Sequence, residues 1–126
     1  MTDECLFCKI AAGEIPAEIV HESETTLAFR DLMPQAPTHV LVIPRSHYPN
    51  AAALAEGEPA TAAHLFDTAR EVAAKEGLEG GYRLVLNTGA DAHQTVFHVH
   101  MHLLGGRAMG WPPGFPPSSA RASSTA

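Results

Sequence analysis

The sequence predicts an α+β domain built on a mainly antiparallel sheet. Three short segments with strand character precede the one long helical segment, and two more follow it. A parallel sheet requires strands that alternate regularly with helices, and this order lacks that alternation. The chain has 126 residues and no internal repeat, which is enough for one domain with a modest core.

The first part of the chain is predicted to hold a short helix and a pair of strands. Residues 5–13 form the helix, with Gly13 at its end, because glycine is favoured just beyond a helix C-terminus. The strands are expected at 18–22 and 26–31, around a turn at Ser23-Glu24-Thr25.

The middle of the chain is predicted to supply a buried strand and the main helix. Residues 39–43 are mostly β-branched and apolar and end at Pro44, which fits a strand covered on both faces. Residues 59–77 form the helix, with Pro59 in its first turn and Gly77 at its end. Its apolar stripe consists of Ala62, Leu65, Phe66, Ala69, Val72 and Ala73.

Two further strands complete the predicted sheet. They span 82–87 and 96–104, and a loop at 88–93 separates them. The second strand ends at Gly105-Gly106. This pattern makes five strands in total, with the long helix between the third and the fourth.

The C-terminus changes composition. From Trp111 onward the chain is rich in proline, glycine, serine and alanine. Such a segment buries too little apolar surface to offset the entropy lost on ordering. We therefore expect residues 1–114 to form a single domain and residues 115–126 to form a flexible tail.

Charge and hydropathy exclude two classes of partner. The formal net charge is −6, so no broad basic face is expected to bind a nucleic-acid backbone. A small phosphorylated ligand is compatible, because one phosphate needs only a few aimed donors. No apolar run approaches the roughly 20 residues that span a membrane, and the acidic N-terminus leads into no signal region. A cytoplasmic location is the expectation.

The run His98-Val99-His100-Met101-His102 is the most unusual feature of the chain. In a strand its three histidines point to one face, about 6.6 Å apart, while the apolar residues between them point to a core. Three interpretations are open: a solvated polar face, a three-histidine metal site, or a nucleophilic or acid–base array. Three ligands along one flat strand are badly spread for a tetrahedral ion, so the array is favoured.

The only two cysteines, Cys5 and Cys8, stand three residues apart. This spacing lets two thiolates converge on one zinc ion. A thioredoxin-like pair would follow a strand, and no strand precedes these residues, so redox use is disfavoured. Two buried cysteines without a ligand are the alternative.

Further short motifs accompany the histidine run. They are Phe7-Cys8-Lys9-Ile10, Gly13-Glu14-Ile15-Pro16, Ala28-Phe29-Arg30-Asp31, Pro34-Gln35-Ala36-Pro37-Thr38-His39, Leu41-Val42-Ile43-Pro44, Gly81-Tyr82-Arg83, Val85-Leu86-Asn87 and Gly105-Gly106-Arg107-Ala108-Met109 with Trp111-Pro112-Pro113-Gly114. Together with the run, which has the form His-x-His-x-His-x-x with apolar x, they resemble the histidine-triad (HIT) superfamily and its Hint branch. The resemblance covers residues 5–114.

This resemblance implies a HIT-like fold and a reaction. The fold has a five-stranded sheet with one long and one short helix, extended across a homodimer. The implied activity is hydrolysis of purine nucleoside 5′-phosphoramidates, such as AMP-NH₂ or AMP joined to an amine, through a nucleotidyl intermediate on His100. The alternatives are a dinucleoside polyphosphate hydrolase or nucleotidyltransferase of the same superfamily, and a non-catalytic purine-nucleotide-binding regulator.

The resemblance also assigns roles around the expected nucleophile, His100. His102 binds phosphate oxygens, and His39 supports the triad from the neighbouring strand. Asn87 and Thr95 donate hydrogen bonds to the phosphate or the leaving group.

Other roles follow from the same resemblance. Gln94 and the backbone of residues 93–96 supply donors to developing charge, and Asp31 accepts the ribose hydroxyls. The base pocket is lined by Ile10, Ile15, Phe29 and Leu32. By likeness to the zinc-bearing members, one structural zinc is held by Cys5, Cys8, His47 and His98.

Overall fold

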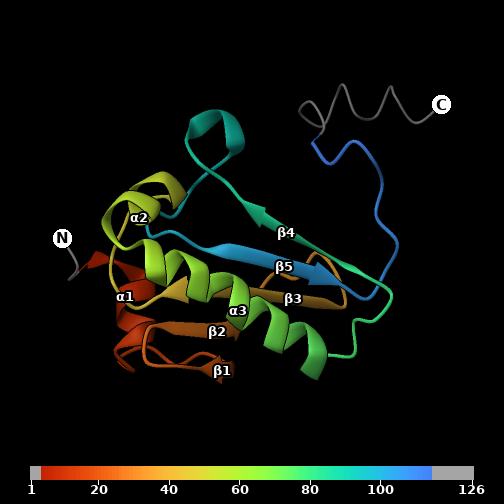
Figure 1. Ribbon diagram of the computed structural model, residues 1–126, viewed down its shortest axis with the longest axis horizontal. Coiled ribbons are helices and arrows are strands. Elements are labelled where there is room, and N and C mark those ends of the chain that lie inside the picture. The colour runs from red at the N-terminus through yellow and green to blue at the C-terminus, as the bar shows by residue number, and fades with distance from the viewer. Residues whose placement is uncertain (1–3, 115–126) are drawn as a thin grey trace.

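The computed structural model describes residues 4–114, and the tail predicted for 115–126 lies outside them. Five antiparallel strands form one sheet in the order β1-β2-β3-β5-β4 (Figure 1). The elements are α1 (Leu6–Ala11), β1 (Ile19–Glu22), β2 (Thr26–Arg30), β3 (Thr38–Pro44), α2 (Ala51–Gly57), α3 (Pro59–Lys75), β4 (Tyr82–Leu86), the 3₁₀ helix η2 (Ala90–Ala92) and β5 (Met101–Gly105). The predicted α+β class with a five-stranded antiparallel sheet is confirmed.

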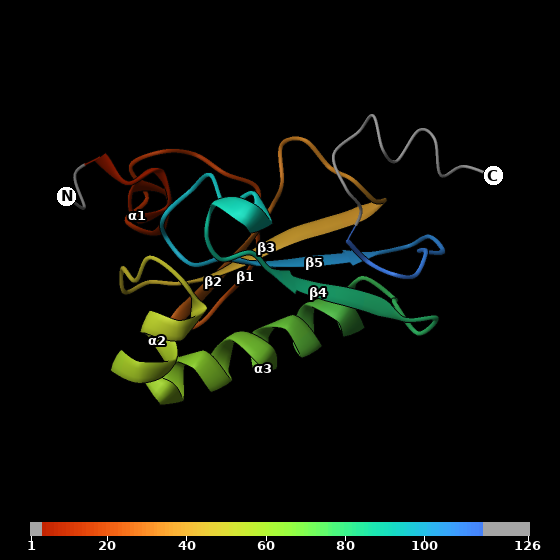
Figure 2. The same cartoon turned by 90° about the horizontal axis from the view of Figure 1, so that it is seen from above.

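The sheet separates two layers. The long helix α3 lies along one face, and α1 lies on the other side with the long connections (Figure 2). The core beneath α3 contains Val42 and Met101, and a second apolar cluster beneath α1 contains Phe7 and Ile43. Every residue of β3 is buried, as the sequence predicts for a strand covered on both faces.

Helix α3 begins at Pro59 as predicted and ends two residues before Gly77, whose φ of +71° only glycine adopts without strain. The predicted apolar stripe is correct except for Phe66, which is 55% exposed. Phe66 follows the buried Leu65, and one residue turns the side chain by about 100° around the helix, away from the sheet. Within residues 4–114 no helix is long and apolar enough to cross a membrane.

Two local predictions differ from the structure. Helix α2 was not expected, so the described chain has three α-helices rather than one long and one short; the signal for α2 was Asn50, whose side chain accepts from the Ala53 N–H and caps it. The last strand begins at Met101 rather than at residue 96. The segment before it leaves β3 because the Val99 N–H donates to the Tyr48 carbonyl at 2.7 Å.

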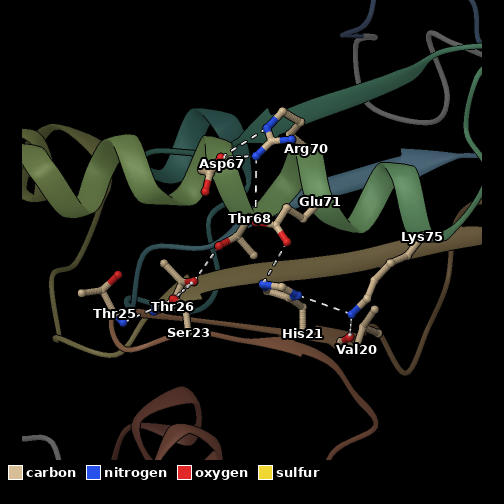
Figure 3. Close-up of polar contacts among 10 residues, drawn as sticks. All are labelled: Val20, His21, Ser23, Thr25, Thr26, Asp67, Thr68, Arg70, Glu71 and Lys75. Atoms are coloured by element: carbon tan, nitrogen blue, oxygen red, sulfur yellow. Dashed lines mark hydrogen bonds and ion pairs between the residues drawn. The ribbon is translucent and has the colours of Figure 1, made fainter.

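Polar contacts hold the β1–β2 hairpin against α3 (Figure 3). The Thr26 and Thr68 hydroxyls are 2.6 Å apart and buried, and the Lys75 ammonium donates to the Val20 carbonyl at 2.8 Å. At the other end of β2, Arg30 donates to both carboxylate oxygens of Glu76, at 3.1 and 2.9 Å. The contacts between Arg30 and Glu76 hold the end of β2, which immediately precedes Asp31.

Candidate active site and zinc site

The histidines of β3 and β5 meet on the sheet face opposite α3. Along β5 the buried Met101 and Leu103 pack into the core under α3, so His102 points to the other face. His39 on β3 reaches it there, with its Nε2 2.9 Å from Nδ1 of His102. His100 follows the same alternation, and its ring centroid is 5.0 Å from that of His102.

The hydrogen bonds of His39 determine which nitrogen of each ring carries the proton. Nδ1 of His39 is 3.0 Å from the backbone N–H of Gln35, which can only donate, so Nδ1 accepts. A neutral His39 therefore carries its proton on Nε2 and donates it to Nδ1 of His102. His102 in turn carries its proton on Nε2, which leaves an N–H donor on the site face.

His100 and His102 carry their protons on different ring nitrogens. Its Nδ1 is 2.9 Å from the backbone carbonyl of His98, which can only accept, so Nδ1 is protonated. Nε2 then carries the lone pair. The ring also packs edge-on against Phe7, with centroids 5.1 Å apart. One ring therefore presents a lone pair and its neighbour presents a donor.

Burial keeps the rings of His102 and His39 neutral. It lowers the pKa of His102 to about 4, with smaller contributions from His100 and His39. Burial also lowers the pKa of His39, against the nearby negative charge of Asp31, whose Oδ2 is 3.5 Å from its Nε2. At neutral pH a neutral His102 donates without adding a positive charge.

Four donor atoms from three separate parts of the chain converge beside this site. They belong to Cys5, Cys8, His47 and His98, and all lie within 4.8 Å of one another. Nδ1 of His98 is 3.3 Å from Sγ of Cys5, 3.5 Å from Sγ of Cys8 and 3.3 Å from Nδ1 of His47. Zn–S bonds of 2.3 Å and Zn–N bonds of 2.0–2.1 Å in a tetrahedron imply ligand separations of about 3.3–3.8 Å.

His98 is oriented for this role. Its Nε2 is 2.9 Å from the Pro44 carbonyl, so Nε2 is the protonated nitrogen and Nδ1 faces the cysteines. The ring is fully buried, and burial lowers its pKa. Burial also raises the pKa of the Cys8 thiol to about 11, with smaller contributions from Cys5. The predicted donor set for one structural zinc is confirmed: two sulfurs and two imidazole nitrogens form a closed four-ligand site.

A cavity of about 480 Å³ opens beside the histidines, between α1 and the ends of β2 and β3. It is lined mainly by apolar side chains, and Asp31 stands among them. The residues predicted for the base pocket all line it: Ile10, Ile15, Phe29 and Leu32. Oδ1 of Asp31 accepts from the Met33 N–H at 2.7 Å, which holds this carboxylate at the mouth of the cavity.

The remaining predicted site residues lie in or next to the connection between β4 and β5. Asn87 follows Leu86, which pairs with Met101, so Asn87 lies beside His100 in the register. Thr95 is exposed and precedes the extended segment that carries the histidines.

Gln94 is placed differently from the expectation. Its Nε2 donates to the carbonyls of Pro49 and Val96, at 2.7 and 3.0 Å, and its Oε1 accepts from the Gly89 N–H at 2.9 Å. The amide is buried, and both its donor and its acceptor atoms are engaged by the backbone. The side chain therefore holds this loop in shape instead of presenting a donor to the site.

Sequence patterns missed contacts that backbone atoms provide. The carbonyls of His98 and Pro44 and the N–H of Gln35 decide the ring orientations, yet no side-chain identity encodes them. Phe7 was also missed as a neighbour of His100. Its place beside Cys8 in an N-terminal motif was the one available signal.

Comparison with known proteins identifies the family. The HIT domain family matches residues 12–109. This chain belongs to the HIT family. It is 50% identical to an uncharacterised HIT-like protein of Synechococcus elongatus, over 90% of this chain and all of that one. It is 49% identical to a 14 kDa zinc-binding protein of Zea mays, over 86% of this chain and 87% of that one.

A solved structure agrees with this placement. The crystal structure of a HIT family hydrolase from Legionella pneumophila superposes with a TM-score of 0.84 at 51% identity, covering 88% of this chain and all of that one. The predicted HIT-like fold is therefore confirmed. The residues that match the family include the segment that carries His98, His100 and His102.

Proposed function

We propose that this HIT-family protein hydrolyses purine nucleoside 5′-phosphoramidates, with His100 as the nucleophile. The observation that carries the proposal is the hydrogen bonding of His100 to the His98 carbonyl and of His102 to His39, from which we infer a free Nε2 lone pair on His100 and an Nε2–H donor on His102. Imidazole is a good neutral nucleophile near pH 7. The similar Legionella pneumophila protein is a HIT family hydrolase, which supports hydrolysis in general.

The proposed reaction has two steps. Nε2 of His100 forms a bond to the α-phosphorus, and the phosphorus–nitrogen bond breaks. The departing amine keeps that bond's electron pair and takes a proton from water. A second water then cleaves the bond between His100 and phosphorus, which releases the nucleoside monophosphate. Covalent catalysis of this kind divides one difficult transfer into two easier steps, because imidazole attacks the substrate more readily than water and is then itself the leaving group when water attacks.

Neighbouring groups are proposed to bind the phosphate. The Nε2–H of His102 donates to a phosphate oxygen, and His39 maintains that protonation state. Asn87 and Thr95 donate to the phosphate or the leaving group, together with the backbone N–H groups of residues 95 and 96. The backbone N–H groups of His93 and Gln94, which the sequence also predicted as donors, are already engaged by the carbonyls of Ala90 and Gly89, each at 3.0 Å. Gln94 acts through the loop that it holds.

The cavity beside the histidines is proposed to hold the nucleoside. Its apolar lining suits a purine base, and its volume of about 480 Å³ falls in the range typical of small-ligand sites. Asp31 at the mouth is proposed to accept the ribose hydroxyls through Oδ2, since Oδ1 is occupied by the Met33 N–H.

One zinc ion is proposed at Cys5, Cys8, His47 and His98. The maize relative is a zinc-binding protein, which supports this assignment together with the geometry of the four donors. Because the ion would have four protein ligands, its contribution is to hold these segments together. The backbone carbonyl of His98 then orients His100.

A homodimer is proposed through the β4 edge. β4 has only one neighbour in the sheet, and Tyr82 on it and Phe66 on α3 are large, exposed apolar side chains. An exposed strand edge readily pairs with a second copy. Sedimentation equilibrium of the full chain distinguishes the dimer from a monomer.

The decisive experiment is turnover of a fluorogenic AMP phosphoramidate by the wild type and by His100→Ala. We expect the variant to lose at least about 10³-fold in kcat/KM while it still binds AMP, because the nucleophile is removed and the cavity is not. His64→Ala, an exposed histidine on α3, is the control and should retain activity. Tight AMP binding by the wild type without turnover would favour a nucleotide-binding regulator. Faster cleavage of a dinucleoside polyphosphate would favour that branch of the superfamily.

A further inference from the structure

A second cavity lies on the histidine face of the sheet, over β4 and β5, rather than at the backbone edge through which β4 would pair with a second copy. Its volume is about 470 Å³, and its lining includes Arg83 on β4, Leu104 on β5, and Arg107 and Met109 beyond β5. Asn87, which we place at the phosphate, also lines it. No carboxylate does so.

The arginines of this cavity differ from the other arginines of the described chain. Arg30, Arg45 and Arg70 each form an ion pair with a carboxylate. Within residues 4–114, Arg83 and Arg107 form none, although the whole chain has a net charge of −6. Two uncompensated guanidinium groups in one recess attract an anion.

The sheet register places this cavity directly beyond the reacting site. His102 pairs with Leu41 on one side and with Val85 on the other. Leu41 lines the first cavity and Val85 lines the second, so His102 lies between them. Neighbouring strands are only about 4.8 Å apart. A substrate with its nucleoside in the first cavity and its phosphorus at His100 can extend its amine leaving group into the second cavity.

We propose that the second cavity binds the leaving group and that Arg83 selects leaving groups that carry an anion, such as an amine bearing a carboxylate. This inference rests on the proposed phosphoramidate hydrolysis and names its substrate class. Nη2 of Arg83 donates to the Gly110 carbonyl at 2.9 Å. Within residues 4–114 its other N–H groups donate to no protein acceptor and are available for a ligand. Arg107 donates from Nε, Nη1 and Nη2 to the carbonyls of Gln35 and Ala108, so it contributes charge and holds the segment before His39.

The test compares two matched substrates: AMP joined through its phosphorus–nitrogen bond to β-alanine, and the same compound with β-alaninamide. They differ only in a carboxylate against an uncharged amide. We expect the wild type to prefer the carboxylate by about tenfold or more in kcat/KM, as for a charge-assisted hydrogen bond. In Arg83→Gln the ratio should fall to about one, and in Arg83→Lys a preference should remain because the charge remains.

Arg70→Gln is the matched control, since it removes an exposed guanidinium on α3 and should leave the ratio unchanged. Raising the salt concentration should also reduce the wild-type preference. A wild-type ratio of one, or a full preference in Arg83→Gln, overturns the inference even if both compounds are hydrolysed. Equilibrium binding of both compounds to His100→Ala gives the same ratio without turnover, so absence of hydrolysis, which would defeat the proposed function, is a separate result.

Discussion

At the scale of single residues, one backbone group orients the ring of each of three histidines, His39, His98 and His100. His39 accepts from Gln35, His100 donates to the carbonyl of His98, and His98 donates to the carbonyl of Pro44. Imidazole rings of the same residue type therefore differ in which ring nitrogen carries the proton. That difference underlies the roles that we propose: a lone pair for attack on His100, a donor for phosphate on His102 and a ligand for zinc on His98.

The neutral state of His102 gives a prediction about pH. Its pKa of about 4 lies below the usual 6.5, so between these values the unfolded chain binds more protons than the folded chain. Stability is therefore lost as the pH falls from about 6.5 to about 4. We expect the free energy of unfolding to depend less on pH in His102→Asn, by at most about 1.4 kcal/mol per pH unit for one proton. Denaturant titrations across this range measure both proteins.

Loss of zinc at low pH lowers the stability of the wild type and of His102→Asn alike, so its effect cancels when the pH dependence of their unfolding free energies is compared. A second measurement uses the ring resonances of His102. Because the charge of Asp31 raises the pKa of His102, Asp31→Asn should lower it further. An unchanged or higher pKa in the variant would contradict the assignment.

At the scale of elements, the site depends on where strands end. β3 and β5 stay paired from Thr38 and Gly105 as far as Val42 and Met101, and then the chains diverge. The Val99 N–H donates to the Tyr48 carbonyl, and the two diverging segments contribute His47 and His98 to the cluster with Cys5 and Cys8. Strand periodicity still predicts which way the histidines point, because extended backbone alternates even without a ladder.

The loop before this segment gives a second prediction. Gln94→Ala removes a buried amide that satisfies three backbone groups, so it should cost about 1–3 kcal/mol of stability. It should also lower kcat/KM by loosening residues 95–98. Gln35→Ala is the control: its side chain is exposed and makes one bond, to the Met33 carbonyl, so the expected cost is below about 0.5 kcal/mol. Equal costs in urea unfolding would refute the positioning role of Gln94.

At the scale of the whole molecule, the zinc site joins segments that are distant in the chain. Cys5 and Cys8 belong to the N-terminal helix, His47 follows β3, and His98 precedes β5. The same helix packs Phe7 against His100 and forms a wall of the cavity that we propose for the nucleoside. The proposed ion thus links stability to the site without touching substrate.

The proposed zinc site leads to a prediction about metal content and melting temperature. We expect about one zinc per chain in the purified protein, and less than about half an equivalent in Cys8→Ser, which lacks one thiolate ligand. Chelation should lower the melting temperature of the wild type and leave that of Cys8→Ser nearly unchanged. His64→Ala should keep its zinc, as measured by metal analysis. Full zinc content in Cys8→Ser would refute the ligand set.

The sequence by itself determined the class of fold, the direction of the histidines and the zinc donors. These properties reside in local periodicity, in residue type and in motifs shared with the HIT family. It missed α2, the exposure of Phe66 and the engagement of Gln94, which depend on how elements pack. Only the tertiary structure decided the proton on each imidazole and the lack of an ion pair at Arg83 within residues 4–114, because both depend on backbone groups and charges that are brought together by folding.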